Sequence, residues 1–191
     1  MKNVDNKKII GFDLDGVIIN HMPAKIKLAK EFGFNLKPKQ TPSEIIEFII
    51  KRPVLDQFLQ TLYYDSRFFK TAFLMRGVKS GLSKLQENDL PFVLISRRHE
   101  PKATIIALKY HGLWPKFFNE NNTFFVAKPE DKNVKAREIG VTHYVDDEAS
   151  VLEKLVDVKN RFLFDNLGAF KNNNGYTRVE SWKKLIKHFL I

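Results

Sequence analysis

The chain has 191 residues, 43% of them hydrophobic, which predicts one globular domain with a sizeable core and room for a small insertion. It carries 32 Lys and Arg against 22 Asp and Glu, and the resulting net charge of +10 favours acidic partners such as phosphorylated small molecules, nucleic acid or a membrane surface. The absence of cysteine excludes disulfides, a thiolate nucleophile and cysteine-ligated metal centres.

Two features of the sequence argue against export and against a membrane as partner. The polar segment at residues 1–8 leads directly into an apolar run, so we expect no signal peptide. Strongly apolar stretches such as Ile45 to Ile50 are far shorter than the roughly 20 residues that span a bilayer. With the lack of cysteine, this pattern favours the cytoplasm.

The N-terminal part of the chain predicts one strand followed by helices. A buried strand is expected over residues 8–14 and helical segments over 22–32 and 43–63, with caps or breakers at Pro23, Gly33, Pro42 and Pro53. The helical block from about 17 to 76 predicts a small cap over a site at the end of the first strand. Ordinary packing of these helices on a sheet edge is the alternative.

The rest of the chain alternates between helices and apolar strands. Helices are predicted over residues 78–88, 101–111, 131–139, 148–157 and 181–190, and strands over 92–95, 123–127, 143–145 and 161–165. This alternation is typical of an α/β fold in which a parallel sheet lies between two layers of helices. Ligands of such folds bind beyond the carboxyl ends of the strands.

Two carboxylates, Asp13 and Asp15, follow the first strand and precede Gly16. Their spacing places both on one face of an extended chain, where like charges repel unless a cation or substrate needs them. A calcium-binding loop is excluded because its fifth and twelfth positions would be Val17 and Ala24. A solvated turn after a strand remains the alternative for this motif taken alone.

Other polar residues also stand at predicted strand ends. Ser96 follows the strand 92–95, the pair Asp146-Asp147 follows the strand 143–145, and Lys132 lies at the start of the helix between them. Carboxylates, a hydroxyl and an ammonium at one edge of a sheet predict a site for a phosphoryl group and Mg²⁺. Each residue alone could equally cap a strand or helix, or be solvated.

The ordered set resembles the haloacid dehalogenase-like (HAD) hydrolase superfamily. The matching motifs are Asp13-Leu14-Asp15-Gly16-Val17, Leu94-Ile95-Ser96, a lysine and Asp146-Asp147, and they cover residues 9 to about 150. The resemblance implies a three-layer, Rossmann-like core over residues 1–16 and 77–191, with a helical cap over residues 17–76.

The resemblance also implies roles for these residues. Asp13 would attack phosphorus, and Asp15 would serve as general acid and then general base. A carboxylate oxygen of Asp13, the backbone carbonyl of Asp15 and one acid of the pair Asp146-Asp147 would hold Mg²⁺, with Asp147 favoured as the direct ligand. Ser96 and a lysine would bind the phosphate; Lys132 is favoured for its position, and Lys128 before Pro129 is the alternative.

Residues after Ser96 and in the cap bear on the substrate. Arg97 is expected to bind a substrate phosphate, although Arg97-Arg98-His99 would also suit a solvated basic loop. One or two of the aromatic residues of the cap could stack on a flat substrate such as a nucleobase, while most form its core. These residues are Phe32, Phe34, Phe48, Phe58, Tyr63, Tyr64, Phe68, Phe69 and Phe73.

The C-terminal part of the chain is similar in pattern to 5′(3′)-deoxyribonucleotidase-like members of the superfamily, in the segments Phe162 to Asn166, Tyr176 to Val179 and Ser181-Trp182. The alternative is that these segments form only a last strand and a helix anchored by Trp182. The sequence thus predicts a Mg²⁺-dependent phosphomonoesterase for small phosphomonoesters, with nucleoside monophosphates first. The alternatives are a phosphatase of sugar phosphates or nucleic-acid ends, and a non-catalytic protein that binds phosphorylated ligands or nucleic acid. Nucleic acid is the less favoured partner, and the oligomeric state stays open.

Overall fold

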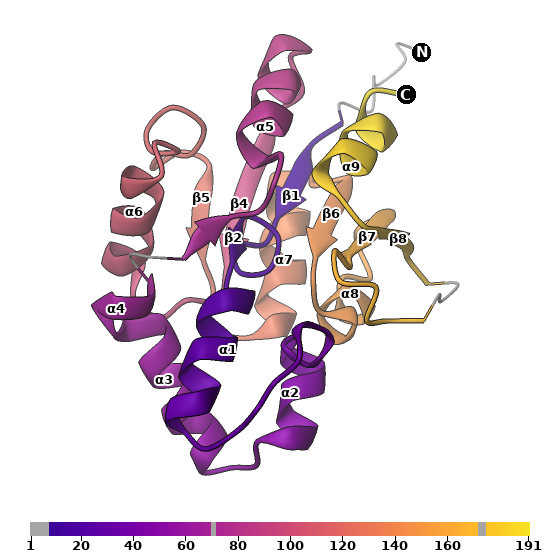
Figure 1. The fold of residues 1–191 in the computed structure, drawn as a ribbon. Coiled ribbons are helices and arrows are strands. Elements are labelled where there is room, and N and C mark those ends of the chain that lie inside the picture. The colour runs from indigo at the N-terminus through magenta and orange to yellow at the C-terminus, as the bar shows by residue number, and fades with distance from the viewer. Residues whose placement is uncertain (1–7, 70–71, 172–174) are drawn as a thin grey trace, which may run out of the picture.

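The computed structural model describes residues 8–69, 72–171 and 175–191. The polar segment that suggested no signal peptide lies almost entirely outside the described residues. A six-stranded parallel sheet in the order β5-β4-β1-β6-β7-β8 forms the centre of the molecule (Figure 1). Its strands are β1 (Ile10–Phe12), β4 (Phe92–Ser96), β5 (Thr123–Phe125), β6 (His143–Asp146), β7 (Asn160–Phe164) and β8 (Thr177–Val179).

The sheet is parallel because each strand is followed by a crossover, and its central strands are continuous apolar runs because helices cover both faces. All residues of β1 and β4 are buried. The chain moves outward from β1 through β4 to β5, returns to β6 on the other side of β1, and then continues to β7 and β8. The carboxyl ends of β1, β4 and β6, three adjacent strands, therefore meet at the place where a doubly wound sheet binds ligands.

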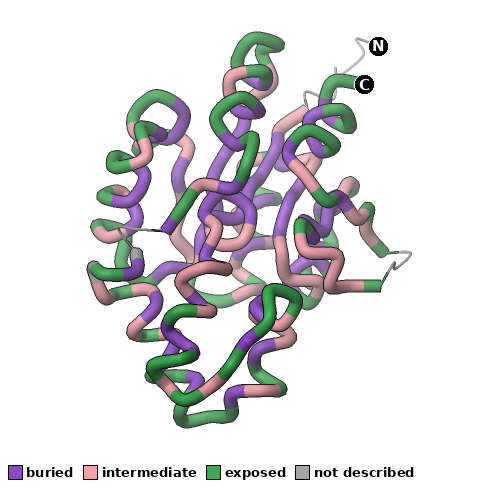
Figure 2. Tube along the Cα trace, in the orientation of Figure 1, coloured by how far each residue is buried: buried purple, intermediate pink, exposed green. Residues whose placement is uncertain are grey.

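Helices form a layer on each face of the sheet, which confirms the predicted three-layer α/β fold. The helices α5 (Val78–Glu87), α6 (Pro101–Tyr110) and α9 (Trp182–Phe189) share one apolar cluster with Phe12 of β1. On the opposite face, α7 (Pro129–Ile139) and α8 (Ala149–Lys154) pack with Ile95 and Leu163. Figure 2 shows the strands and the inner helix faces buried and the outer faces exposed.

A helical unit lies beyond the carboxyl ends of the strands, at the bottom of Figure 1. It contains α1 (Met22–Glu31), the short 3₁₀ helix η1 (Pro38–Gln40), α2 (Ser43–Ile49), α3 (Val54–Tyr64) and α4 (Ser66–Phe69), and it has its own apolar cluster around Leu28, Ile46 and Phe58. The helical segment expected over 43–63, with Pro53 as a breaker, is present as two helices. α2 ends at Ile49, and Pro53 directly precedes the first turn of α3, where the missing N–H of a proline is tolerated.

A small antiparallel hairpin of β2 (Ile19–Asn20) and β3 (Phe73–Leu74) joins this helical unit to the sheet. Two-residue strands give almost no periodic signal, and the sequence did not predict them. Val17 and Met75 at the base of the hairpin pack in the apolar cluster of β1 and α9, and the indole N–H of Trp182 donates to the carbonyl of Val17 at 2.9 Å. This packing favours assigning the hairpin to the core rather than to the cap. The limits of 17 and 76 for the cap stay a prediction.

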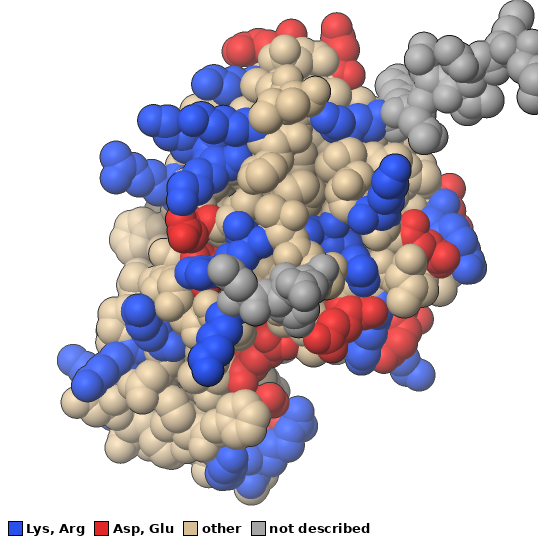
Figure 3. All heavy atoms as spheres, turned by 90° about the vertical axis from the view of Figure 1, so that its right-hand side faces the viewer, with Lys and Arg blue, Asp and Glu red and all other residues tan. Residues whose placement is uncertain are grey.

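The outer surface carries many basic side chains. On the face in Figure 3, Lys and Arg are spread over the surface with Asp and Glu among them, which fits a diffuse positive field better than a single basic patch. None of the helices within the described residues is long and apolar enough to cross a membrane.

Candidate active site

Three carboxylates converge at the carboxyl ends of β1 and β6. Asp13 directly follows β1, Asp146 is the last residue of β6, and Asp147 comes next; one carboxylate oxygen of each lies within 4.8 Å of the others. The backbone N–H of Asp13 donates to the carbonyl of Val145 at 2.9 Å, which fixes the two strand ends side by side. The sequence prediction that these acids meet at one edge of the sheet agrees with this geometry.

The ammonium of Lys132 lies between two of these acids. Its Nζ is 2.5 Å from Oδ1 of Asp13 and 2.7 Å from Oδ2 of Asp146, and only 1% of the residue is exposed. Burial acts to lower the pKa of Lys132, but the two carboxylates outweigh it and hold that pKa well above its usual value. Lys128, the alternative from the sequence, is exposed at the start of α7. The structure therefore brings Lys132, and not Lys128, to the acids.

One ammonium does not compensate two buried carboxyls and the half-buried carboxyl of Asp147. Burial raises the pKa of Asp13 to about 6 although Lys132 acts to lower it, and burial likewise raises the pKa of Asp146 and Asp147. Gly16 has φ +82°, and a Cβ at this position would lie 2.0 Å from Oδ2 of Asp147, so only glycine leaves room for that carboxylate. The cluster of hard oxygen donors and uncompensated charge fits a divalent cation.

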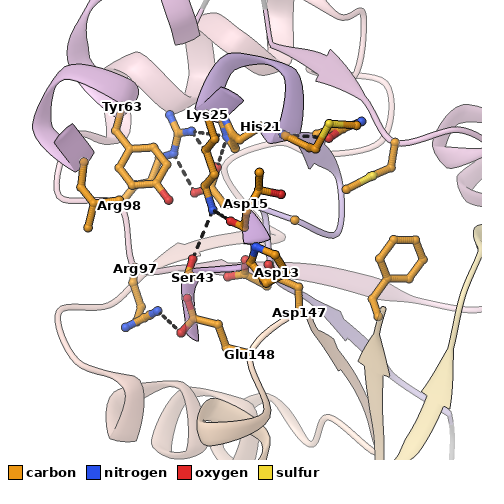
Figure 4. Close-up of a pocket in the computed structure, with 18 of the residues that line it drawn as sticks. Asp13, Asp15, His21, Lys25, Ser43, Tyr63, Arg97, Arg98, Asp147 and Glu148 are labelled. Carbon is orange, nitrogen blue, oxygen red and sulfur yellow. Dashed lines mark hydrogen bonds and ion pairs between the residues drawn. The ribbon is translucent and has the colours of Figure 1, made fainter. Parts of the chain in front are cut away.

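Asp15 has different partners from Asp13. Arg98 donates to both of its oxygens, from Nε to Oδ2 at 2.9 Å and from Nη2 to Oδ1 at 2.7 Å, and Nε2 of His21 lies 2.5 Å from Oδ1. Burial acts to raise the pKa of Asp15, but Arg98 and His21 hold it well below the usual range. Figure 4 shows Arg98 and His21 on the cap side of Asp15.

The basic residues after β4 take separate positions. Arg97, expected to bind phosphate, places Nη2 2.6 Å from Oε2 of Glu148, on the side of the pocket opposite His21 (Figure 4). Arg98, which the sequence left without a role, is the one that reaches Asp15. Ser96, the last residue of β4, is 1% exposed, and its Oγ accepts a hydrogen bond from the backbone N–H of Arg98 at 3.2 Å.

A pocket of about 550 Å³ lies between the helical unit and the sheet, and its lining includes Asp13, Asp15, Asp147, Arg97 and Arg98. Ser96, Lys132 and Asp146 lie behind this lining. Tyr63 and Tyr64 of α3 line the pocket from the cap, and Phe164 and Phe170 line it from the C-terminal part of the core. Of the aromatic cap residues noted in the sequence whose side chains the structure describes, only these two tyrosines contribute to the lining. Phe58, for example, is buried in the cap's own cluster. The guanidinium of Arg98 lies over the ring of Tyr63, 5.0 Å from its centre.

Two contacts that the sequence did not indicate organise the rim of this pocket. Glu44 of α2 accepts hydrogen bonds from the backbone N–H groups of Ala149 (3.1 Å) and Ser150 (2.7 Å), so a cap residue caps the core helix α8. On the other rim, buried Asp165 accepts from the backbone N–H groups of Ala169 and Phe170 and from Nε of Arg178. The C-terminal motif thus holds the loop that carries Phe170.

Comparison with solved structures gives the same fold. A HAD-superfamily hydrolase from Ehrlichia chaffeensis is 13% identical and matches with a TM-score of 0.61, covering 96% of each chain. A HAD family hydrolase from Deinococcus radiodurans, solved with bound phosphate and sodium, is 16% identical with a TM-score of 0.63, covering 95% of this chain and 94% of that one. A HAD phosphatase from Thermococcus onnurineus is 18% identical with a TM-score of 0.60, covering 95% and 97%.

No curated protein matches the chain. A family model does: "5' nucleotidase, deoxy (Pyrimidine), cytosolic type C protein" matches residues 7–190, nearly the whole sequence. The match includes the acids after β1 and β6, Lys132 between them and both halves of the pocket. The chain therefore belongs to this nucleotidase family of haloacid dehalogenase-like hydrolases, and it is an enzyme of the phosphatase type.

Proposed function

We propose that this protein is a Mg²⁺-dependent phosphomonoesterase that acts on nucleoside monophosphates through an aspartyl-phosphate. The observation that carries the proposal is the position of Asp13. Its carboxylate is held by Lys132 inside a cluster of acids and faces a pocket that also contains Asp15. A nucleophile, an acid–base group and a phosphate-binding cation are thus within reach of one substrate.

In the first step, Asp13 carries out the attack. Lys132 holds Oδ1 of Asp13, so the other carboxylate oxygen forms the bond to phosphorus while the bond from phosphorus to the leaving oxygen breaks. Lys132 and the Oγ of Ser96 bind the phosphoryl oxygens, on which negative charge is spread in the transition state. Asp15 supplies the proton that the leaving oxygen takes up.

The source of that proton is the pair of Asp15 and His21. At 2.5 Å, Oδ1 of Asp15 and Nε2 of His21 share one hydrogen bond, and its proton can be transferred when His21 is the protonated imidazolium. Burial lowers the pKa of His21 although Asp15 acts to raise it, so the imidazolium gives up this proton readily. Transfer of this proton to the leaving oxygen releases the alcohol. In the second step the pair takes a proton from the water that attacks phosphorus, the bond between phosphorus and Asp13 breaks, and inorganic phosphate leaves.

The metal would be held by a carboxylate oxygen of Asp13, the backbone carbonyl of Asp15 and a carboxylate of Asp147, with Asp146 held by Lys132 behind them. A bound Mg²⁺ supplies charge that stabilises the carboxylate cluster and the phosphoryl oxygens. The hydrogen bond from Lys132 to Asp146 favours this division between the two neighbouring acids.

The preference for nucleotides is supported by the walls of the pocket. Tyr63 and Tyr64 on the cap side and Phe164 and Phe170 on the core side offer ring faces to a flat leaving group. A volume of about 550 Å³ is within the range of pockets that bind molecules of nucleotide size. Sugar phosphates would use the same polar groups but would leave the aromatic walls without a stacking partner.

The test is a phosphate-release screen over nucleoside 5′- and 3′-monophosphates, sugar phosphates and oligonucleotides with terminal phosphates. We expect nucleoside monophosphates to have the highest kcat/KM, and we expect EDTA or Asp13→Asn to abolish release. Higher kcat/KM for sugar phosphates or for oligonucleotide ends would move the substrate class to those compounds. Release that does not exceed the Asp13→Asn background on any substrate would overturn the catalytic proposal and leave a protein that only binds phosphorylated ligands.

A further inference from the structure

Lys25 is a buried cation in the pocket that the proposed mechanism does not use. It lies on α1 of the cap, and only 6% of the residue is exposed. Its Nζ donates to the carbonyl of Thr41 at 2.9 Å and approaches Oγ of Ser43 at 3.4 Å. Figure 4 shows its side chain reaching from the cap toward Asp15, with Ser43 beside it.

The other cations around the site have carboxylate partners: Lys132 with Asp13 and Asp146, Arg98 with Asp15, and Arg97 with Glu148. Lys25 differs from them, because none of the carboxylates in the described part of the chain lies within ion-pair distance of its ammonium. The acids whose charge acts on it most strongly are Asp147 and Glu148 of the core, across the pocket from α1.

A buried ammonium without a carboxylate is costly, since it gives up hydration and receives no full counter-charge. A purely structural role would be to hold the segment between η1 and α2 through the carbonyl of Thr41. A neutral donor could make that hydrogen bond without the cost of desolvating a charge. The protein's own contacts therefore do not explain why a charged side chain is buried at this position. Because Lys25 lines the pocket, its ammonium is placed to bind a ligand.

We propose that Lys25 and Ser43 form a subsite on the cap that binds an oxyanion of the substrate. The proposal rests on the phosphomonoesterase function above and adds a second contact from the cap, besides that of His21, to a reaction centre built mainly by the core. A substrate held at once by Lys132 of the core and Lys25 of the cap would keep the pocket closed during the reaction. The oxyanion is a phosphate oxygen, either of the phosphoryl group that is transferred or of a second phosphate on the leaving group.

The variant Lys25→Met removes the charge and keeps the length and bulk of the side chain, and Lys25→Gln also keeps a donor for the carbonyl of Thr41. The matched control is Lys30→Met, an exposed lysine on the same helix. Binding of inorganic phosphate is measured by calorimetry in the presence of Mg²⁺. Steady-state constants are measured for a nucleoside 5′-monophosphate and for the corresponding 3′,5′-bisphosphate, and Tm is measured for every variant.

We expect both Lys25 variants to lose about 10-fold to 100-fold in affinity or kcat/KM, the range for a hydrogen bond to a charged group, with Lys30→Met unchanged. A loss for inorganic phosphate and for both nucleotides places the transferred phosphoryl group at the subsite. A loss for the bisphosphate alone places a second phosphate there. We also expect Tm to stay equal or rise in Lys25→Met, because a buried unpaired charge is removed.

The subsite proposal would be overturned if either Lys25 variant kept the wild-type affinity for phosphate and the wild-type kcat/KM for both nucleotides. A fall in Tm with those constants intact would assign Lys25 to a structural role and would overturn it as well. The phosphate-binding measurement separates this proposal from the proposed function. A wild-type protein that hydrolyses nothing, yet loses phosphate affinity on Lys25→Gln, would disprove the function and keep the oxyanion subsite.

Discussion

Asp13→Asn is expected to stabilise the metal-free protein at pH 7 while it abolishes hydrolysis. Burial raises the pKa of Asp13 from 3.8 to about 6, so ionising this carboxyl is harder in the folded protein than in the unfolded chain. At about 1.4 kcal/mol per pKa unit, the difference corresponds to about 3 kcal/mol. This is an upper limit, because the neutral asparagine amide accepts a weaker hydrogen bond from Lys132 than the carboxylate does.

The gain should depend on pH in a defined direction. Below about pH 4, Asp13 is protonated in both the folded and the unfolded state and imposes no penalty. Between about pH 4 and pH 6 the unfolded chain gives up this proton first, so the wild-type protein loses stability as the pH rises, and above pH 6 the loss is complete. Asparagine does not titrate, and the difference between variant and wild type should therefore grow from near zero to its full value over this interval.

Thermal unfolding in EDTA at several pH values between 4.5 and 8 measures this difference. For a chain of this size, 3 kcal/mol corresponds to an increase in Tm of about 6 to 12 °C at pH 7. Asp15→Asn is the matched control with the opposite sign, because Arg98 and His21 stabilise the ionised form of Asp15 and lose an ionic partner in the variant. A lower Tm for Asp13→Asn at pH 7, or a difference that does not change with pH, would refute the reasoning.

Three other changes test the remaining parts of the site. Mg²⁺ at 100 times its Kd should stabilise the wild-type protein at pH 7 by about 2.7 kcal/mol, which is measured as a rise in Tm. Asp147→Asn should lose most of this rise, and an equal rise in both proteins would exclude Asp147 as a ligand. Lys132→Met should abolish phosphate release. It should also lower the free energy of unfolding in urea by about 3 to 5 kcal/mol, because it leaves two buried carboxylates without a partner. Full activity of this variant would exclude Lys132 from the mechanism. Arg98→Lys keeps the charge but loses the paired donors that fit both oxygens of Asp15, so kcat should fall about 10-fold or more with Tm nearly unchanged; a wild-type kcat would show that this pairing is dispensable.

The sequence predicted the parts of the fold that rest on long periodic segments. Buried strands such as Phe92–Ser96 are continuous apolar runs, and the acids and Ser96 follow them at the strand ends, where any parallel sheet brings its carboxyl ends together. The hairpin of β2 and β3 was missed because two residues per strand carry no period. The break between α2 and α3 was indicated by Pro53, but the pattern did not show that α2 already ends at Ile49.

Apart from the contact of Lys132 with Asp13 and Asp146, most side-chain contacts between distant segments were beyond sequence reasoning. Arg97 and Arg98 are adjacent and chemically identical, and only the direction in which each leaves the end of β4 gives one to Glu148 and the other to Asp15. Lys25 has the spacing of an ordinary helix residue, and its burial depends on how α1 lies over the core. These assignments depend on tertiary packing that local propensity and periodicity do not record.

The division of roles that we propose between Asp13 and Asp15 also depends on tertiary packing. Two aspartates separated by one residue start with the same intrinsic pKa, and nothing in their spacing separates a nucleophile from an acid–base group. The fold places Asp13 beside other acids, whose charge favours a cation. It places Asp15 beside the guanidinium of Arg98 and the imidazole of His21, and in the proposed mechanism His21 and Asp15 supply the proton for the leaving oxygen. Because His21 directly precedes the cap helix α1 and Asp15 lies between β1 and the turn at residues 16–18, the hydrogen bond between the two side chains joins cap and core. Opening the pocket would therefore separate Asp15 from its proton partner, so proton transfer should require a closed cap.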